Sequence, residues 1–424
     1  MVTSAEPSPR VSAPVDVHPM RTLWLLSIAH AVNHAQAVLL PLVYLKVIDE
    51  FGVTVQTIAF LSAIGSFAAG IIQLSYAALT RVVARRDLLV AGGFLMGGGF
   101  AAQAAANTFG AFSIANVASR LGSSPQHPVG NGLLAEQFPA ERRGFAISAH
   151  IAGGNVGTVV VALAGAWLIL NAGWRVTVVV FGLPAVIVSV GILLFVRERG
   201  TDRDAAIAHG SVRDAFRLIL RDRNHFWIYL TSVLGGGGRG LGVVNLFALL
   251  YLTKVIGLDD QTSGFMYGVL IALSVPMPLV AGWLSDRLGR KPLIVGVYLG
   301  GAVGFALFIL VGSSLVGLWL GIVVMGLFSF AESPQLQALL ADVAPSAIRD
   351  VSFAAYFTLA FGIGSLWTAL YGGIVDRVGN SAGLPIVFWL MAATFIAAAV
   401  TTLPIQGHGR AEAQTRRAGE ADHF

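Results

Sequence analysis

Residues 121–128 read LGSSPQHP, and residues 330–337 read FAESPQLQ. The tripeptide Ser-Pro-Gln thus occurs twice, each time inside a long apolar run and beside an ionisable residue. Proline removes one hydrogen bond from a helix, so both runs are expected to be interrupted. What surrounds these two tripeptides decides how the chain folds.

The apolar runs are too many and too long for a soluble protein. Of the 424 residues, 56% are hydrophobic and 12% are charged, whereas a soluble domain carries roughly 25% charged residues. A helix that crosses a membrane needs about 20 mostly apolar residues. We predict an all-α integral membrane protein with twelve such helices, at residues 22–45, 54–79, 88–106, 109–135, 144–170, 173–196, 225–252, 261–284, 292–311, 315–341, 351–374 and 383–404.

A charged central stretch divides the twelve predicted helices into six and six. We predict a disordered tail (1–20), an N-terminal six-helix bundle (21–196), a central loop (197–224), a C-terminal six-helix bundle (225–404) and a second tail (405–424). Most of the 27 lysines and arginines fall in alternate loops and in the tails. Because cytoplasmic loops are enriched in basic residues, we expect a multi-pass protein of the cell inner membrane with both termini, and the central loop, in the cytoplasm.

The two halves carry related sequences. Residues 52–60, GVTVQTIAF, and 257–265, GLDDQTSGF, share the pattern G-x-x-x-Q-T-x-x-F. This match and the two Ser-Pro-Gln tripeptides occur in the same order in each half, which indicates a parallel repeat with a substrate site near the bilayer midplane. A freed backbone carbonyl is tolerated at that depth only beside water or protein. We therefore expect Pro125 and Pro334 to form matching kinks on cavity-lining helices and to act as flex points during gating.

Residues 282–291, GWLSDRLGRK, match the loop signature G-x-x-x-D-R-x-G-R-K. In this feature, and in its twelve predicted helices, the chain resembles the major facilitator superfamily. The resemblance implies two six-helix bundles and a cytoplasmic latch, with gating roles for Asp286, Arg287 and Arg290. The corresponding first-half stretch, residues 77–86, reads AALTRVVARR and keeps only Arg85 and Arg86 of the signature.

A closer resemblance is to the fosmidomycin-resistance branch of that superfamily. It rests on GSSPQHP at 122–128, on ERRGFAISAHIAGGNVG at 141–157 and on AHAVNHAQAVLLP at 29–41. In that branch an acidic residue usually follows the asparagine, whereas here Asn33 is followed by His34. Gly144, Gly153 and Gly157 also match half of the helix 5 motif of antiporters. These resemblances favour proton-coupled efflux.

Six ionisable residues fall near the middle of predicted helices: His30, His34, Arg120, His127, Arg239 and Glu332. Inserting each of them into the membrane costs roughly 2.5–3.5 kcal/mol. They lie in helices 1, 4, 7 and 10, the helices that the superfamily resemblance implies as cavity-lining. We predict a shared cavity in which the substrate contacts Arg239, Arg120, His34, Asn33, Gln126, His127 and Gln335. Glu332 and His34 are predicted to couple transport to protons.

Structural roles remain open for the same residues. His34 is either a proton carrier or a neutral histidine bonded to a neighbouring helix. His127 precedes Pro128 and either contacts substrate or bonds the loosened helix. Glu332 either carries a proton or forms a fixed ion pair with Arg239 or Arg120.

Positive charge exceeds negative charge among these residues, and arginine grips a carboxylate or phosphonate with two parallel hydrogen bonds. The sequence therefore predicts a secondary active transporter that moves a small organic anion by alternating access, by proton-coupled efflux. An importer or exchanger of a small carboxylate is the alternative, and a non-transporting membrane sensor is an alternative of another class.

Several other classes are not expected. The sequence has no cysteine and no H-E-x-x-H, so it offers no thiol catalysis and no such zinc site. We expect no enzyme activity, no cofactor, no metal and no nucleic acid. The expected partners are an anionic solute, protons or a counter-ion, and lipid, with the chain as a monomer.

Overall fold

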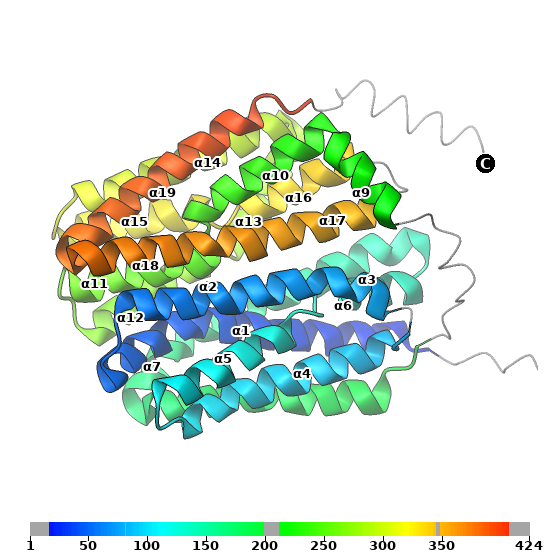
Figure 1. Cartoon of the computed structure of the whole chain (residues 1–424), viewed down its shortest axis with the longest axis horizontal. Helices are drawn as coiled ribbons and strands as arrows, with labels where there is room; N and C mark the ends of the chain where they lie inside the picture. Colours follow the sequence, from blue (N-terminus) through cyan, green and yellow to red (C-terminus); the bar gives the residue numbers. More distant parts are fainter. Residues whose placement is uncertain (1–16, 81, 199–211, 345–347, 407–424) are drawn as a thin grey trace, which may run out of the picture.

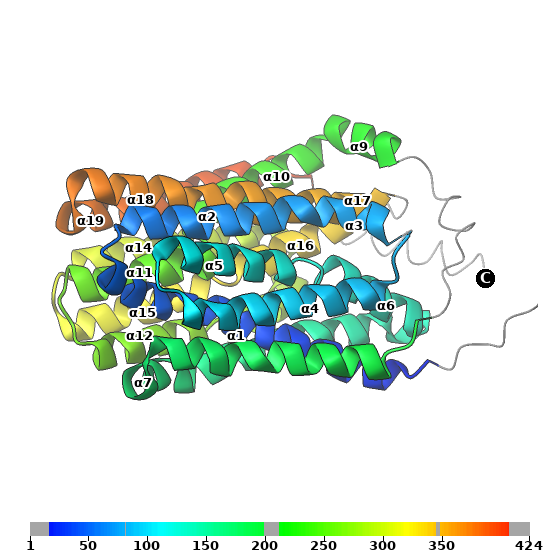
Figure 2. The ribbon, with the colours of Figure 1, turned by 60° about the horizontal axis from the view of Figure 1, so that its bottom comes forward.

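The computed structural model describes residues 17–80, 82–198, 212–344 and 348–406. Helices run alongside one another down the long axis of the molecule (Figures 1 and 2). In Figure 1 the first helix starts at the lower right and the last helix ends at the top, right of centre. We call this right-hand side of the bundle the terminal end. Most of both predicted tails lies outside the described residues.

The described part of the first half consists of seven α-helices, of which α2 with α3 and α5 with α6 are interrupted segments. Their bounds are α1 Pro19–Phe51, α2 Val55–Ile72, α3 Tyr76–Leu79, α4 Arg85–Ala102, α5 Phe109–Ser123, α6 Pro128–Gln137 and α7 Ala140–Phe195. The long α7 is broken at Gly173, whose φ of 78° is open to glycine but strained for other residues. Its two arms are the predicted helices 5 and 6.

The second half repeats this plan with more interruptions. Its helices are α10 Arg223–Gly235, α11 Asn245–Lys254, α12 Asp260–Ala272, α13 Pro276–Leu288, α14 Arg290–Leu310, α15 Leu315–Phe328, α16 Glu332–Val343, α17 Arg349–Phe357, α18 Leu366–Val378 and α19 Asn380–Thr402. Within the predicted central loop, α9 spans Val212–Arg221. The sequence analysis did not predict this helix.

By length and composition, nine helices of the described chain can each cross a membrane, and a bent pair, Arg223–Gly238 with Gly240–Lys254, makes ten. One of the nine spans, residues 153–195, is too long for a single crossing, because about 20 residues suffice. Its break at Gly173 gives two crossings, and α5 with α6 forms another interrupted one. Divided in this way, the described helices are compatible with twelve crossings, and the exact number stays a prediction.

The first Ser-Pro-Gln tripeptide, residues 124–126, lies in a break between two helices, whereas the second, residues 333–335, lies in the first turn of a helix, just after a break. In the first half α5 ends at Ser123 and α6 begins at Pro128. In the second half α15 ends at Phe328 and α16 begins at Glu332. The predicted interruptions are therefore present at corresponding places, while the role of Pro125 and Pro334 as flex points stays a prediction.

The halves touch along two main lines. One is formed by α2 against α18 and the turns before it, which lie side by side in both views (Figures 1 and 2). Here the backbones meet directly, because a Cβ added to Gly70 would lie 2.6 Å from the backbone nitrogen of Gly362. The other line joins α7 and α12, where a Cβ on Gly268 would lie 2.7 Å from the carbonyl oxygen of Ala162. Small residues thus allow the bundles to pack closely.

Two ion pairs join the halves at the end opposite the termini. Lys254 Nζ lies 2.8 Å from the Asp49 carboxylate, and Lys46 pairs with Asp260. The Tyr267 hydroxyl also donates to the Val38 carbonyl across the same boundary. In this conformation the halves are therefore held together at that end.

Candidate functional site

A buried ion pair connects two of the predicted site residues. Arg239 Nε lies 2.6 Å from Glu332 Oε1, and the two residues are 6% and 0% exposed. Glu332 Oε2 accepts a second hydrogen bond, 3.2 Å long, from the Tyr298 hydroxyl. The pair therefore joins the break between α10 and α11 to α16, and both charges are removed from water.

Arg239 lies in the glycine-rich break between α10 and α11, which sets the position of its side chain. Arg239 itself has extended backbone angles, between the turns Gly236–Gly238 and Gly240–Val244. A Cβ on Gly238 would lie 2.6 Å from the Phe395 ring, so only glycine lets these helices approach so closely. The Gly240 amide donates to the Ser329 carbonyl at 2.9 Å, which fixes this break against the break before α16.

The other guanidinium nitrogens of Arg239 are also occupied. Nη1 donates to the Ala360 carbonyl, and Nη2 donates to the Ser232 carbonyl at 3.1 Å. The guanidinium carbon lies 5.2 Å from the centroid of the Phe361 ring. Of the alternatives open for Glu332, an ion pair with Arg239 is the one seen in this conformation, and Glu332 balances the positive charge of Arg239.

Arg120, by contrast, has no carboxylate partner among the described residues. Its Nη1 lies 3.3 Å from the Ser66 hydroxyl, and its Nε has no hydrogen-bond partner. Its aliphatic stem packs against Gly65, where an added Cβ would lie 3.0 Å from Cγ. The side chain is partly exposed. Arg120 bonds a residue of α2, whereas Arg239 bonds Glu332 and two backbone carbonyls of the C-terminal half, and a cavity common to the two arginines stays a prediction.

Helix α1 and the break between α5 and α6 bring most of the first-half candidates together. Asn33 Nδ2 lies 3.5 Å from the Ser123 carbonyl, which is one of the carbonyls at that break. His34 and His127 are both partly exposed, and each ring lies within 5 Å of His30, at centroid distances of 4.6 and 4.8 Å. Thus Asn33, His34 and His127 belong to one polar cluster. We call it the helix 1–4 cluster, after the first and fourth predicted helices, 22–45 and 109–135.

The two glutamines of the repeated tripeptide are buried. Gln126 is 1% exposed and Gln335 is 2% exposed, and the side-chain oxygen of each has no hydrogen-bond partner in the described chain. An unsatisfied buried carbonyl is unfavourable. Each glutamine therefore has an acceptor available for a solute or for water, although the two lie in different halves.

The predicted gating loop forms an ion pair that recurs in the other half. Arg290 Nε lies 3.1 Å from the Asp342 carboxylate, next to α16. In the first half Arg85 Nη1 lies 2.6 Å from the Glu136 carboxylate, at the end of α6. The degenerate first-half loop has thus kept the arginine that makes the equivalent contact.

The remaining gating residues are less informative. Arg287 lies over the Trp283 ring, with its guanidinium carbon 3.7 Å from the ring centroid. Asp286 belongs to α13, but its side chain lies outside the described residues. The gating roles of Asp286, Arg287 and Arg290 remain predictions.

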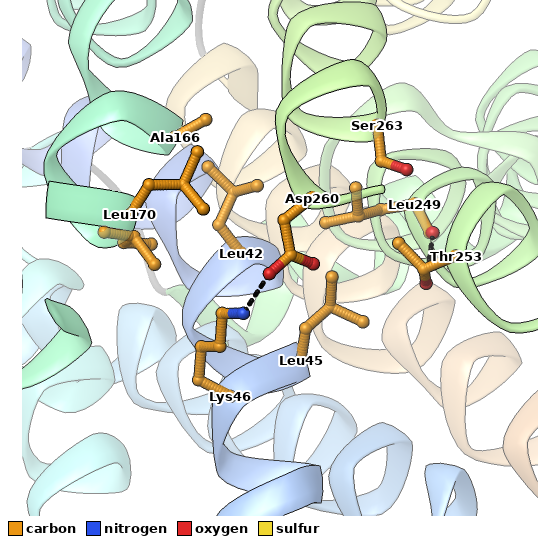
Figure 3. A pocket seen from close by; sticks show the side chains of 10 residues that line it. Leu42, Leu45, Lys46, Ala166, Leu170, Leu249, Thr253, Asp260 and Ser263 are labelled. Atoms are coloured by element: carbon orange, nitrogen blue, oxygen red, sulfur yellow. Dashed lines mark hydrogen bonds and ion pairs between the residues drawn. The ribbon is translucent and has the colours of Figure 1, made fainter. Parts of the chain in front are cut away.

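A small pocket lies apart from the predicted site, at the end opposite the termini. Its lining includes Leu42, Lys46 and Asp260, and the Lys46–Asp260 ion pair lies at its edge (Figure 3). None of the predicted site residues lines it. This ion pair and its counterpart were not predicted, because Lys46 and Asp260 lie at helix ends 214 residues apart and opposite charges so distant in sequence give no signal of being partners.

The comparisons with known proteins agree with this architecture. The sequence profile of the Major Facilitator Superfamily matches residues 26–369. The chain belongs to the major facilitator superfamily. It is therefore a multi-pass membrane protein and a secondary transporter rather than an enzyme, as the sequence indicated.

Two curated relatives within the superfamily have low sequence identity to this chain but match most of its length. The cis,cis-muconate transport protein of Acinetobacter baylyi is 25% identical over 307 residues, covering 70% of this chain and 72% of that protein. The fosmidomycin resistance protein of Escherichia coli is 26% identical over 398 residues, covering 89% and 93%. The predicted resemblance to the fosmidomycin-resistance branch is therefore confirmed.

Solved structures share the fold of this superfamily member. The D-xylose–proton symporter matches with a TM-score of 0.74 at 16% identity, covering 91% of this chain and 97% of that chain. A bacterial homologue of the human lysosomal transporter Spinster, in an inward-facing and unoccupied conformation, matches with a TM-score of 0.68 at 15% identity, covering 91% and 95%. At such identities the likeness concerns the fold alone.

Proposed function

We propose that this transporter moves a small organic anion by alternating access, with efflux driven by protons. The observation that carries the proposal is the state of Arg120. The residue is partly exposed near the end of α5, and among the described residues its one side-chain hydrogen bond is to the Ser66 hydroxyl. A permanently charged group within a membrane bundle needs a partner, and a carboxylate or phosphonate fits its planar fork.

The proposed anion site combines Arg120 with uncharged polar groups. Asn33, His34 and His127 belong to the helix 1–4 cluster, next to the break that follows Arg120. Gln126 and Gln335 have side-chain oxygens without partners, while their amide groups can donate hydrogen bonds. Hydrogen-bond donors around one fixed positive charge favour an anion over a cation.

Two relatives support an anionic cargo. Muconate is a dicarboxylate, and fosmidomycin is a phosphonate. Proteins named for these two compounds cover most of this chain at 25% and 26% identity. Both compounds present the flat or tetrahedral oxyanions that arginine binds well.

The Arg239–Glu332 pair is the proposed site of proton coupling. Protonation of Glu332 would remove its negative charge and so weaken its hold on Arg239. Arg239 would then be free to turn toward an arriving anion, which keeps it among the proposed substrate-binding residues. His34 is the second proposed proton carrier, because a neutral imidazole has a ring nitrogen that can accept a proton and this residue is partly exposed.

The direction of transport, efflux or import, is inferred from two sequence features and one relative. Half of the antiporter motif in α7 and the likeness to a resistance protein support efflux. The histidine at position 34, in place of an acidic residue, supports import or exchange instead. Uptake by vesicles with an imposed pH gradient distinguishes the two, because only an antiporter accumulates anion on the side from which protons leave.

Transport by purified protein in lipid vesicles tests the proposal. Muconate is the anionic probe, D-xylose the neutral one, and Arg377→Ala, at an exposed arginine, is the matched control. We expect muconate transport that falls at least 10-fold in Arg120→Ala and is partly kept in Arg120→Lys. Equal transport by wild type and Arg120→Ala would remove Arg120 from the site, and the lack of any solute movement would favour the sensor alternative.

A further inference from the structure

Four histidines from three parts of the chain meet in the N-terminal half. His30 and His34 are one turn apart on α1, His127 lies in the break between α5 and α6, and His150 lies on α7. The His30 ring is central, with centroid distances of 4.6 Å to His34, 4.8 Å to His127 and 4.5 Å to His150. The proposed anion site uses two of these residues but does not explain why four are grouped.

The hydrogen bond of His30 fixes its tautomer. Its Nδ1 lies 2.9 Å from the carbonyl oxygen of His150. A carbonyl can only accept, so Nδ1 carries the proton and Nε2 keeps a free lone pair. That Nε2 is buried without a hydrogen-bond partner, and the whole residue is 0% exposed. Histidines that bind metals usually donate their other ring N–H to a carbonyl or carboxylate in this way.

Two further histidines complete a set of nitrogen ligands. One ring nitrogen from each of His30, His34 and His127 lies within 4.8 Å of the other two. Tetrahedral ligands at zinc–nitrogen distances of 2.0–2.1 Å are about 3.4 Å apart, so modest rotation of the two partly exposed rings closes the set. Gly154 lies behind His34, where an added Cβ would be 3.0 Å from the ring, so the lack of a side chain at this position leaves room for the ring.

We propose that His30, His34 and His127 bind one divalent first-row transition ion of the zinc type. Imidazole nitrogen suits zinc, copper and nickel, whereas magnesium and calcium prefer oxygen ligands. Three histidines leave a fourth position open, as in zinc sites that bind water or an exchangeable anion. No metal was expected from the sequence, which lacks the H-E-x-x-H pattern, but the fold brings His127 to the two histidines of α1.

The site would also connect the halves. The His127 ring stacks on Phe357 of the C-terminal half, with centroids 5.9 Å apart and planes 15° from parallel. An ion that holds His127 would therefore fix one face of the contact between the bundles.

Titration of the full-length protein in detergent with Co²⁺ tests the proposal, since Co²⁺ replaces Zn²⁺ and absorbs visible light. We expect one equivalent of Co²⁺ to bind with a tetrahedral absorption band that Zn²⁺ abolishes and Mg²⁺ does not. His34→Gln and His127→Gln should each weaken binding at least about 10-fold. His18→Gln, outside the cluster, is the matched control and should bind as the wild type does.

Two results would overturn the proposal. One is the absence of stoichiometric binding to wild type, and the other is unchanged affinity in both the His34→Gln and His127→Gln variants. These two positions decide the outcome even if His30→Gln fails to fold, because both side chains are partly exposed. Melting temperatures without metal, equal to that of wild type, will show that the variants are folded.

Discussion

Arg239 and Glu332 form a charge pair, 2.6 Å from Nε to Oε1, across an interruption in each of two helices of the C-terminal half. Each residue alone would be an uncompensated charge in a nearly water-free position. The pair therefore explains why a guanidinium is stable among five glycines, and it makes the stability of the half depend on both residues together.

We predict that Glu332→Gln destabilises the protein less than Arg239→Ala does. Each substitution leaves one buried charge unpaired, which costs about 3–5 kcal/mol. Glutamine keeps hydrogen bonds to Arg239 and Tyr298, whereas alanine also removes the hydrogen bonds from Arg239 to the Ala360 and Ser232 carbonyls. The melting temperature in detergent measures this. Arg290→Ala, which breaks the more exposed pair with Asp342, should cost about 0–1 kcal/mol. A wild-type melting temperature for Arg239→Ala would contradict the prediction.

The same Glu332→Gln variant should lose the pH dependence of transport, because glutamine cannot exchange a proton. Initial rates in lipid vesicles are compared with and without a pH gradient, with the Asp342→Asn variant as the control for a surface carboxylate. An unchanged response to the gradient would assign proton coupling elsewhere, with His34 as the next candidate.

The ion pairs Lys46–Asp260 and Lys254–Asp49 are expected to favour closure at the end opposite the termini. Each is partly exposed, and such pairs contribute about 0.2–1 kcal/mol. Removing both lysines should thus shift the population toward the state open at that end by roughly 2- to 30-fold.

The rate of labelling reports this shift. The natural chain has no cysteine, so Leu42→Cys, in the pocket beside the first pair, provides a single thiol for a maleimide. Labelling should speed up in Lys46→Ala/Lys254→Ala and slow again in the charge-reversed pair Lys46→Asp/Asp260→Lys. Equal labelling rates would show that the pairs do not bias the conformation.

Gly70→Ala should separate the bundles. The added methyl would lie 2.6 Å from backbone atoms of Gly362, which cannot rotate away as a side chain can. We expect a lower melting temperature and reduced transport, whereas Gly98→Ala, whose Cβ meets nothing within 4 Å, should be neutral or slightly stabilising. Equal effects of the two substitutions would mean that this contact opens without cost.

Asp222 should make the start of α10 sensitive to acid. Burial raises the pKa of this carboxyl, but hydrogen bonds from the His225 amide and ring outweigh burial, so the net pKa is lowered. A lowered pKa stabilises the fold above the ordinary value of 3.8, and this stability is lost as the pH falls through the folded-state pKa.

Melting temperatures between pH 3 and pH 6 test the role of Asp222. The side chain also caps α10 by accepting from the His225 amide at 2.8 Å, and loss of such a cap costs about 1 kcal/mol. The difference between wild type and Asp222→Ala should shrink as the pH falls. A difference that is constant with pH would show that the carboxylate charge contributes nothing.

The sequence predicted most of the fold because lipid imposes a strong constraint on each helix separately. The predicted helix at 315–341, for example, corresponds to α15 and α16 over 315–343. The break at Pro125 was also predictable, because proline acts locally. Helix α9 was missed, since its charged residues carry no membrane signal.

The arrangement of the site was harder to predict. Whether Glu332 pairs with Arg239 or with Arg120 depends on which helix faces which, and hydropathy does not report facing. The grouping of His30 with His150 needs a contact across 120 residues, which spacing along one helix cannot reveal. The ion pair between Lys46 and Asp260 could not be predicted for the same reason, since it joins residues far apart in the sequence.

The crossed arrangement of Lys46–Asp260 and Lys254–Asp49 has a consequence for the idle carrier. Each bundle supplies one cation and one anion, so parting the halves at that end strains both links at once and neither can substitute for the other. Such exposed attractions fade as dissolved ions accumulate, with a screening distance of about 8 Å at 0.15 M. The unloaded protein should therefore rest in different proportions of its two states in dilute and in saline surroundings.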